Sequence, residues 1–231
     1  DVNIDHQSDF YGQIAVQGPK GEEAVEKILG LACAELAFYT FKCVETEGET
    51  IIVSRTGYTG EDGFEIYASH ALTNKYWDQL IAAGVQPCGL GCRDTLRFEV
   101  GLPLYGDELT DDITPIMAGL GLFVKIDKED FIGKSVVADQ KANGVAKKIV
   151  GIELADKAIP RHGYNVLTME GEVIGEVTTG YNSISTGKSV CMALINSAYA
   201  KLDTPVQVQI RKKTFPGKVV KKQFYQKSYK K

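Results

Sequence analysis

A stretch with three glycines in seven positions constrains this chain more than any other part of its sequence. The stretch is 54–67, SRTGYTGEDGFEIY, and its glycines are Gly57, Gly60 and Gly63. Because only glycine reaches positive φ without a steric penalty, the spacing predicts a tight, irregular loop. The residues that follow, 64–68, alternate between apolar and polar side chains, which predicts a strand with one buried face. The fold must therefore hold a glycine-rich loop against the start of a strand.

Glu65 is the candidate binding residue of this stretch. Phe64 and Ile66 are expected to face the core, and Glu65 the opposite side. A carboxylate at the mouth of such a loop can accept two parallel hydrogen bonds from a planar pair of N–H groups. The alternative is that Glu65 is the solvent-facing residue of a half-exposed strand. The pattern alone leaves both interpretations open.

The first 90 residues predict an α+β layer with antiparallel strands. In chain order the predicted elements are a strand at 14–16, a helix that begins at Pro19 and ends just before Gly30, a hairpin of 41–46 and 50–55 that turns at Glu47-Gly48, the strand at 64–68, and a helix that contains Leu72, Tyr76 and Leu80 and ends at Gly84.

A further short helix is predicted at 91–100. Cys92, Leu96 and Val100 are four residues apart and are expected to face the core. Arg93 and Arg97 share the same spacing and are expected to form a second, polar face.

Two arginines on one helix face repel each other unless an anion lies between them. Asp94 and Glu99 could supply that anion from within the chain. The alternative is the carboxylate of a ligand, because a guanidinium binds a planar carboxylate through two hydrogen bonds.

A change of pattern near 139–146 predicts a boundary between an α+β region at 1–140 and a second domain at 147–231. Beyond the boundary the sequence holds short β-type runs with glycine-containing turns and no convincing helix. The runs are 149–154, 164–169, 172–178, 189–195 and 206–210. Such a pattern is typical of a small all-β barrel or sandwich.

Composition excludes several classes of protein. Of the 231 residues, 44% are hydrophobic and 24% charged, which is ordinary for a globular chain. No apolar run approaches the roughly 20 residues that cross a bilayer, so we expect no membrane association. The five cysteines are irregularly spaced, and the histidines are scattered. We expect reduced, mostly buried thiols and no metal site.

Positive charge is concentrated at the C-terminal end. Residues 201–231 hold ten Lys or Arg and one acidic residue, so they carry +9, while the preceding 200 residues carry −13. The total of −4 argues against a nucleic-acid partner, because dedicated nucleic-acid binders are basic overall. An acidic protein or a ligand with carboxylates fits better. The alternative is a lysine-rich strand edge that discourages aggregation.

Several segments, in register along the chain, resemble the aminomethyltransferase (T-protein) family of the glycine cleavage system. They are 15–19 (AVQGP), 54–67, 88–106 (CGLGCRDTLRFEVGLPLYG), 113–116 (ITPI), 118–120 (AGL) and 131–134 (FIGK). The resemblance implies a folate-binding α+β region followed by a C-terminal β-barrel. It also implies transfer of a one-carbon unit from an aminomethyl-lipoyl group on the H-protein to tetrahydrofolate, with release of ammonia.

The resemblance also assigns site residues. Tyr58, Glu65 and Arg93 match ligand-contacting residues of the family, and Tyr229 matches a contact residue near its C-terminus. No residue here matches the family's catalytic Asp, so we expect the N-terminal region that carries it to be missing and name no catalytic residue.

Three alternatives remain at this point. One is a non-catalytic folate-binding relative of iron–sulfur cluster assembly factors, although residues 56–62 lack the cysteine of that group's motif. The others are an inactive fragment of the transferase and the folate domain of a larger oxidase or demethylase. The expected location is a bacterial cytoplasm, or the mitochondrial matrix in a eukaryote.

Overall fold

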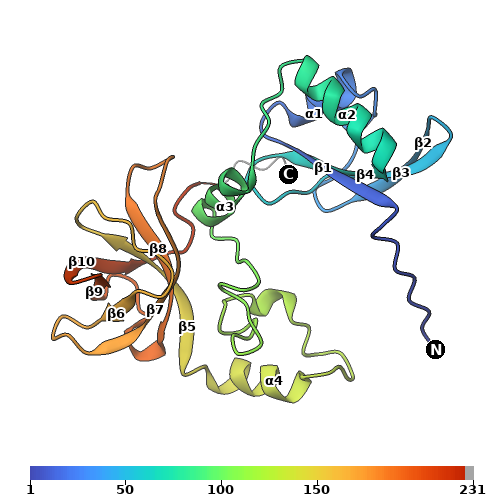
Figure 1. Ribbon diagram of the computed structural model, residues 1–231. Coiled ribbons are helices and arrows are strands. Elements are labelled where there is room, and N and C mark those ends of the chain that lie inside the picture. The colour runs from blue at the N-terminus through green and yellow to red at the C-terminus, as the bar shows by residue number, and fades with distance from the viewer. Residues whose placement is uncertain (227–231) are drawn as a thin grey trace. The chain divides into compact units, whose positions relative to one another are not determined.

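The computed structural model describes residues 1–226 and divides them into two compact units, 1–96 and 97–226. The first unit holds a four-stranded antiparallel sheet, two helices that pack on it and the first turns of a third helix (Figure 1). The second holds a closed β-barrel preceded by irregular segments. No helix in residues 1–226 combines the length and the apolar character that a membrane crossing requires.

The sheet of the first unit has the strand order β1-β4-β3-β2. Its strands are β1 (Tyr11–Gln17), β2 (Phe41–Thr46), β3 (Glu49–Ser54) and β4 (Gly63–Ser69). The hairpin of β2 and β3 turns at Glu47 and Gly48, whose φ angles are 51° and 83°. Positive φ at both turn residues matches the twist of the strands. The predicted hairpin is confirmed.

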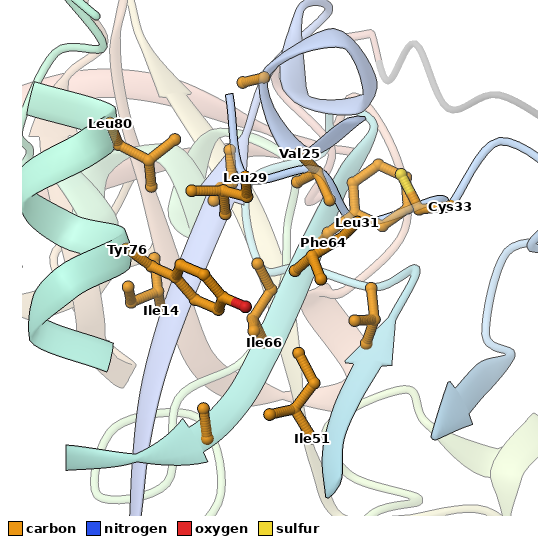
Figure 2. Packing of buried hydrophobic residues seen from close by; sticks show 14 of the residues in the cluster. Ile14, Val25, Leu29, Leu31, Cys33, Ile51, Phe64, Ile66, Tyr76 and Leu80 are labelled. Atoms are coloured by element: carbon orange, nitrogen blue, oxygen red, sulfur yellow. The ribbon is translucent and has the colours of Figure 1, made fainter. Parts of the chain in front are cut away.

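Two helices cover one face of this sheet: α1 (Gly21–Lys27) and α2 (His70–Ala82). The Ser69 hydroxyl caps α2 by accepting a hydrogen bond from the Leu72 amide at 3.3 Å. Figure 2 shows the Tyr76 ring extending from α2 toward Ile14 and Ile66 in the shared core. Burial of each such large apolar side chain contributes on the order of 2 kcal/mol.

Strand β4 alternates as the sequence predicts. Phe64, Ile66 and Ala68 are buried in the core, whereas Glu65 and Tyr67 on the other face are half-buried. Strand β1 lies at the sheet edge and pairs with β4, with Ala15 opposite Glu65. This register places Glu65 beside an edge strand, where a ligand can approach.

Helix α3 (Leu90–Glu99) forms where it was predicted, but the predicted exposure of two of its side chains is wrong. Cys92 is exposed instead of facing the core, and Arg97 is fully buried while Arg93 is exposed. Arg97 donates to Glu108 at 2.6 Å, to Asp107 at 3.2 Å and to the Thr179 hydroxyl at 3.2 Å. The two arginines therefore do not share one polar face.

Two later elements were missed by the sequence analysis. Helix α4 (Lys134–Asn143) has no buried residue, so it lacks the apolar stripe on which helix prediction depends. Strand β10 (Lys213–Val220) contains Pro216 and Gly217, which are unusual inside strands. Besides these, the second unit contains two short 3₁₀ turns, η1 (Gly121–Phe123) and η2 (Ser197–Tyr199).

The barrel closes in the order β10-β5-β8-β7-β6-β9. Its other strands are β5 (Lys147–Leu154), β6 (Asn165–Leu167), β7 (Val173–Asn182), β8 (Ser189–Asn196) and β9 (Pro205–Ile210). Closure leaves no free sheet edge. The predicted fold class, an α+β region followed by a small all-β barrel, is confirmed. The domain boundary at 139–146 stays a prediction.

Candidate functional site

A cavity of about 360 Å³ lies beside the edge strand β1 in the first unit. It is lined by residues 13–17 of β1, by residues 85–88 after α2, and by the side chains of Tyr58, Thr59, Glu65, Trp77, Leu80, Ile81, Arg93 and Leu96. Three of the four residues predicted to bind a ligand therefore line one cavity. The fourth, Tyr229, lies outside the described residues.

Glu65 reaches this cavity from the middle of β4. Its Oε2 accepts a hydrogen bond from the Tyr67 hydroxyl at 3.1 Å. Burial and the nearby Glu65 charge both raise the pKa of Tyr67, so Tyr67 remains a hydrogen-bond donor at neutral pH. The half-buried carboxylate is thus oriented by a neighbour on the same strand face.

Tyr58 and Arg93 come from different parts of the sequence and meet at the cavity. The Arg93 guanidinium carbon lies 4.5 Å from the centre of the Tyr58 ring. A guanidinium over an aromatic face is held by the ring's quadrupole, and its hydrogen-bonding edge is left to other partners. Arg93 lies in the first turn of α3, where its backbone N–H donates to Gly89 at 3.1 Å.

The base of the glycine-rich loop is closed by a buried ion pair. Arg55 donates to Asp62 from Nε at 2.8 Å and from Nη2 at 2.5 Å, and Nη2 also donates to Glu22 at 2.8 Å. The guanidinium also lies over the Phe64 ring, 5.0 Å from its centre. The hydrogen bonds to Asp62 raise the pKa of Arg55 above its ordinary value. Residues 56–61 therefore project from a fixed base.

The loop glycines have different physical roles from those predicted. Only Gly60 has a positive φ, 81°. A Cβ on Gly57 or Gly63 would instead overlap the side chain of Gln17, at 1.9 and 2.6 Å respectively. Sequence reasoning missed Gln17, since its position at the end of a strand gave no sign that it packs into a loop some 40 residues away.

The cavity combines an apolar wall with three converging polar or aromatic groups. The apolar surface comes from Trp77, Leu80 and Ile81 of α2, and the charged groups are Glu65 and Arg93. A flat heterocycle with adjacent N–H donors and a separate carboxylate would match the Glu65 oxygens, the Tyr58 ring and the Arg93 guanidinium. A larger cavity of about 470 Å³ beside α1 contains none of the predicted site residues.

The cysteines and potential metal ligands do not form a site. In residues 1–226 no group of three or more His, Cys, Asp or Glu side chains could hold a metal ion. All five cysteines are free, and three of them, Cys43, Cys88 and Cys92, are exposed. The expectation that the thiols are mostly buried is therefore wrong. Burial raises the pKa of Cys33 to about 12, which keeps that thiol protonated.

Comparison with known proteins places both parts of the chain. Residues 1–128 match the GCVT N-terminal domain, and residues 147–226 match the glycine cleavage T-protein C-terminal barrel domain. The aminomethyltransferases of Alkaliphilus oremlandii and Bacillus subtilis are each 50% identical to it, over 100% and 97% of this chain. The chain spans 64% of the length of both relatives.

A solved structure agrees with these matches. The crystal structure of the glycine cleavage system aminomethyltransferase T from Bartonella henselae superposes with a TM-score of 0.90 at 30% identity, over 96% of this chain and 61% of that one. The sequence, the cavity-bearing sheet and the C-terminal barrel lead to one conclusion. The chain belongs to the glycine cleavage T-protein family.

Proposed function

We propose that this chain functions in the tetrahydrofolate-dependent aminomethyltransferase reaction of the glycine cleavage system. The reaction moves the methylene carbon of an aminomethyl group, held on a lipoyl sulfur of the H-protein, to tetrahydrofolate. The products are 5,10-methylenetetrahydrofolate, ammonia and the dihydrolipoyl arm. Family membership supports the reaction class, and the relatives named above come from bacteria, so the proposed location is a bacterial cytoplasm.

The observation that carries the proposal is the convergence of Tyr58, Glu65 and Arg93 on one cavity. In the proposed complex, the pterin ring lies against Tyr58, and its ring N–H and exocyclic amine donate to Glu65. Arg93 binds a carboxylate of the glutamate tail. The cavity volume of about 360 Å³ falls in the range of small-molecule sites.

These residues act by binding and orientation. A pterin fixed at both its donor edge and its tail presents its reactive nitrogen in one position, which converts a bimolecular encounter into a directed one. Apolar side chains of α2 line one side of the cavity. We assign no catalytic residue within this chain.

The proposed protein partner is the lipoyl-carrying H-protein. Arg211, Lys212 and Lys213 are exposed at the turn between β9 and β10, which gives the barrel a cluster of positive charge for an acidic partner. Lys222 does not belong to this cluster. Its Nζ donates to the carbonyl of Ala118, and burial lowers the pKa of Lys222.

Calorimetric titration of the chain with tetrahydrofolate tests the binding claim. The parent should bind, and Glu65→Gln should weaken binding by about 1–3 kcal/mol, because it leaves pterin donors poorly paired. Glu170→Gln, at an exposed position on the barrel, is the matched control and should bind like the parent. Equal affinity in Glu65→Gln and the parent would remove Glu65 from the site.

Single-turnover transfer from aminomethyl-lipoyl H-protein then tests the reaction. Formation of methylenetetrahydrofolate and ammonia in equal amounts supports the transferase. Binding of tetrahydrofolate without transfer would instead favour the non-catalytic relative or the inactive fragment of the transferase.

A further inference from the structure

Gln17, the last residue of β1, contacts the glycine-rich loop at three points. Its Nε2 donates to the carbonyl of Thr56 at 3.1 Å and to the carbonyl of Phe64 at 3.3 Å. Its Oε1 accepts a hydrogen bond from the Thr59 hydroxyl at 3.2 Å. One half-buried amide therefore joins the start, the middle and the end of the loop.

The neighbouring backbone strengthens the same connection. The N–H of Gly18 donates to the carbonyl of Asp62 at 2.8 Å, and the Asp62 side chain is held by Arg55. The Thr59 hydroxyl also accepts a hydrogen bond from the Glu61 amide at 3.3 Å. The end of β1 thus fixes both the base of the loop and its interior.

Two glycines leave the space that Gln17 occupies. A Cβ on Gly57 would lie 1.9 Å from the Gln17 Oε1, and one on Gly63 would lie 2.6 Å from its Cδ. Neither glycine has a positive φ, so backbone conformation does not require glycine at either position. The amide of Gln17 fills the space that a side chain would need at either position, which explains why both are glycine.

We propose that Gln17 is a positioning residue that holds Tyr58 and Thr59 at the wall of the ligand cavity. Both hydrogens of its amide group already serve backbone carbonyls, so it has none to offer a ligand. It acts through the loop, which presents Tyr58 to the cavity and to Arg93. The identification of the ligand as folate rests on the proposed function, whereas the effect of Gln17 on the loop does not depend on it.

Hydrogen exchange of the ligand-free chain tests the positioning role. In Gln17→Ala, the amides of residues 56–61 should exchange at least about tenfold faster, because the loop loses its hydrogen bonds with the Gln17 amide group. Gln13→Ala is the matched control: it is the same residue type on the same strand, and its side-chain hydrogen bond, donated to the Tyr67 hydroxyl at 3.5 Å, does not involve the loop. Its loop exchange should equal that of the parent.

Second-site rescue supplies a readout that a merely destabilising change would not give. Gly57→Ala alone should lower the unfolding midpoint, because its methyl group meets Gln17. In a Gln17→Ala background the same substitution should cost little, since the space is then open. Simple addition of the two effects would contradict the packing role of Gln17.

Titration with tetrahydrofolate completes the test. Gln17→Ala should bind about tenfold more weakly than the parent, in parallel with its faster loop exchange. Weaker binding with unchanged loop exchange would show direct ligand contact and overturn the proposal. If the parent itself fails to bind, the proposed function fails, while exchange and rescue still decide the role of Gln17.

Discussion

The Arg93 guanidinium lies over the Tyr58 ring, with its carbon 4.5 Å from the ring centre. The two residues are 35 positions apart, and the contact joins the glycine-rich loop to the first turn of α3. A stacked guanidinium keeps its N–H edges available, so Arg93 can stabilise Tyr58 and bind an anion at the same time. This contact joins the cavity wall to the guanidinium that we propose binds an anion.

Arg93 should discriminate between folates and pterins that lack the glutamate tail. Arg93→Ala is expected to weaken tetrahydrofolate binding about 10- to 100-fold, since a charge-assisted hydrogen bond is lost. Affinity for tetrahydropterin, which has no tail carboxylate, should fall much less. Calorimetry with both ligands measures the difference. Equal losses for the two ligands would mean that Arg93 acts only through Tyr58.

Loss of Asp62 should destabilise the first unit, because Arg55 is only 2% exposed. Asp62→Ala leaves the buried Arg55 guanidinium paired with Glu22 alone of these two carboxylates. We therefore expect a loss of about 3 kcal/mol in the free energy of unfolding. Urea unfolding gives the value. Glu22→Gln removes the more exposed partner and should cost less. The opposite order would contradict the assigned geometry.

Glu99 should give the second unit a component of stability that is lost in acid. Burial raises the pKa of Glu99, but hydrogen bonds from Ser183 and Ser185 outweigh it and leave the pKa below its ordinary value. A lowered pKa stabilises the fold above the unfolded-state pKa of about 4.3, and that stability disappears as pH falls through the folded-state value.

Glu99→Gln should therefore lower the free energy of unfolding by about 2 kcal/mol at pH 7. The difference from the parent should shrink as pH falls below about 4. Ser183→Ala, which removes one donor, should show part of the same effect. A constant difference from pH 7 to pH 3, measured by urea unfolding, would rule out this linkage.

Charge reversal at the β9–β10 turn should slow association with the H-protein. The double substitution Lys212→Glu and Lys213→Glu is expected to lower the association rate about threefold to tenfold at low salt, with little effect at high salt. Stopped-flow mixing measures both conditions. Lys222→Met serves as the comparison, because that side chain is directed to Ala118. A rate independent of both salt and substitution would exclude electrostatic docking at this turn.

Local pattern was sufficient for much of the fold and for the position of Glu65. Alternation placed Glu65 opposite Phe64 and Ile66, and spacing gave α2 and most barrel strands. The family resemblance then singled out Tyr58 and Arg93. The helices and strands were predictable because strand and helix periods depend on nearest neighbours in the chain, whereas the ligand-binding roles of Tyr58 and Arg93 stay predictions.

Contacts between distant segments could not be predicted in this way. Arg97 follows Arg93 by four residues in α3, but the loop after the helix supplies its partner, Glu108. Gln17 acts on residues about 40 positions away, and the meaning of Gly57 becomes clear only once Gln17 is placed beside it. Strand β10 was not predicted because Pro216 and Gly217 have low strand propensity. Pairing with β5 and β9, which closes the barrel, overrides that propensity.

A crystal structure of the chain with tetrahydrofolate tests the central claim most directly. We predict pterin density in the cavity beside β1, with the ring N–H and exocyclic amine within about 3 Å of the Glu65 oxygens. The tail carboxylate should meet Arg93. Pterin density at another cavity, or with its donor edge turned away from Glu65, would contradict the account.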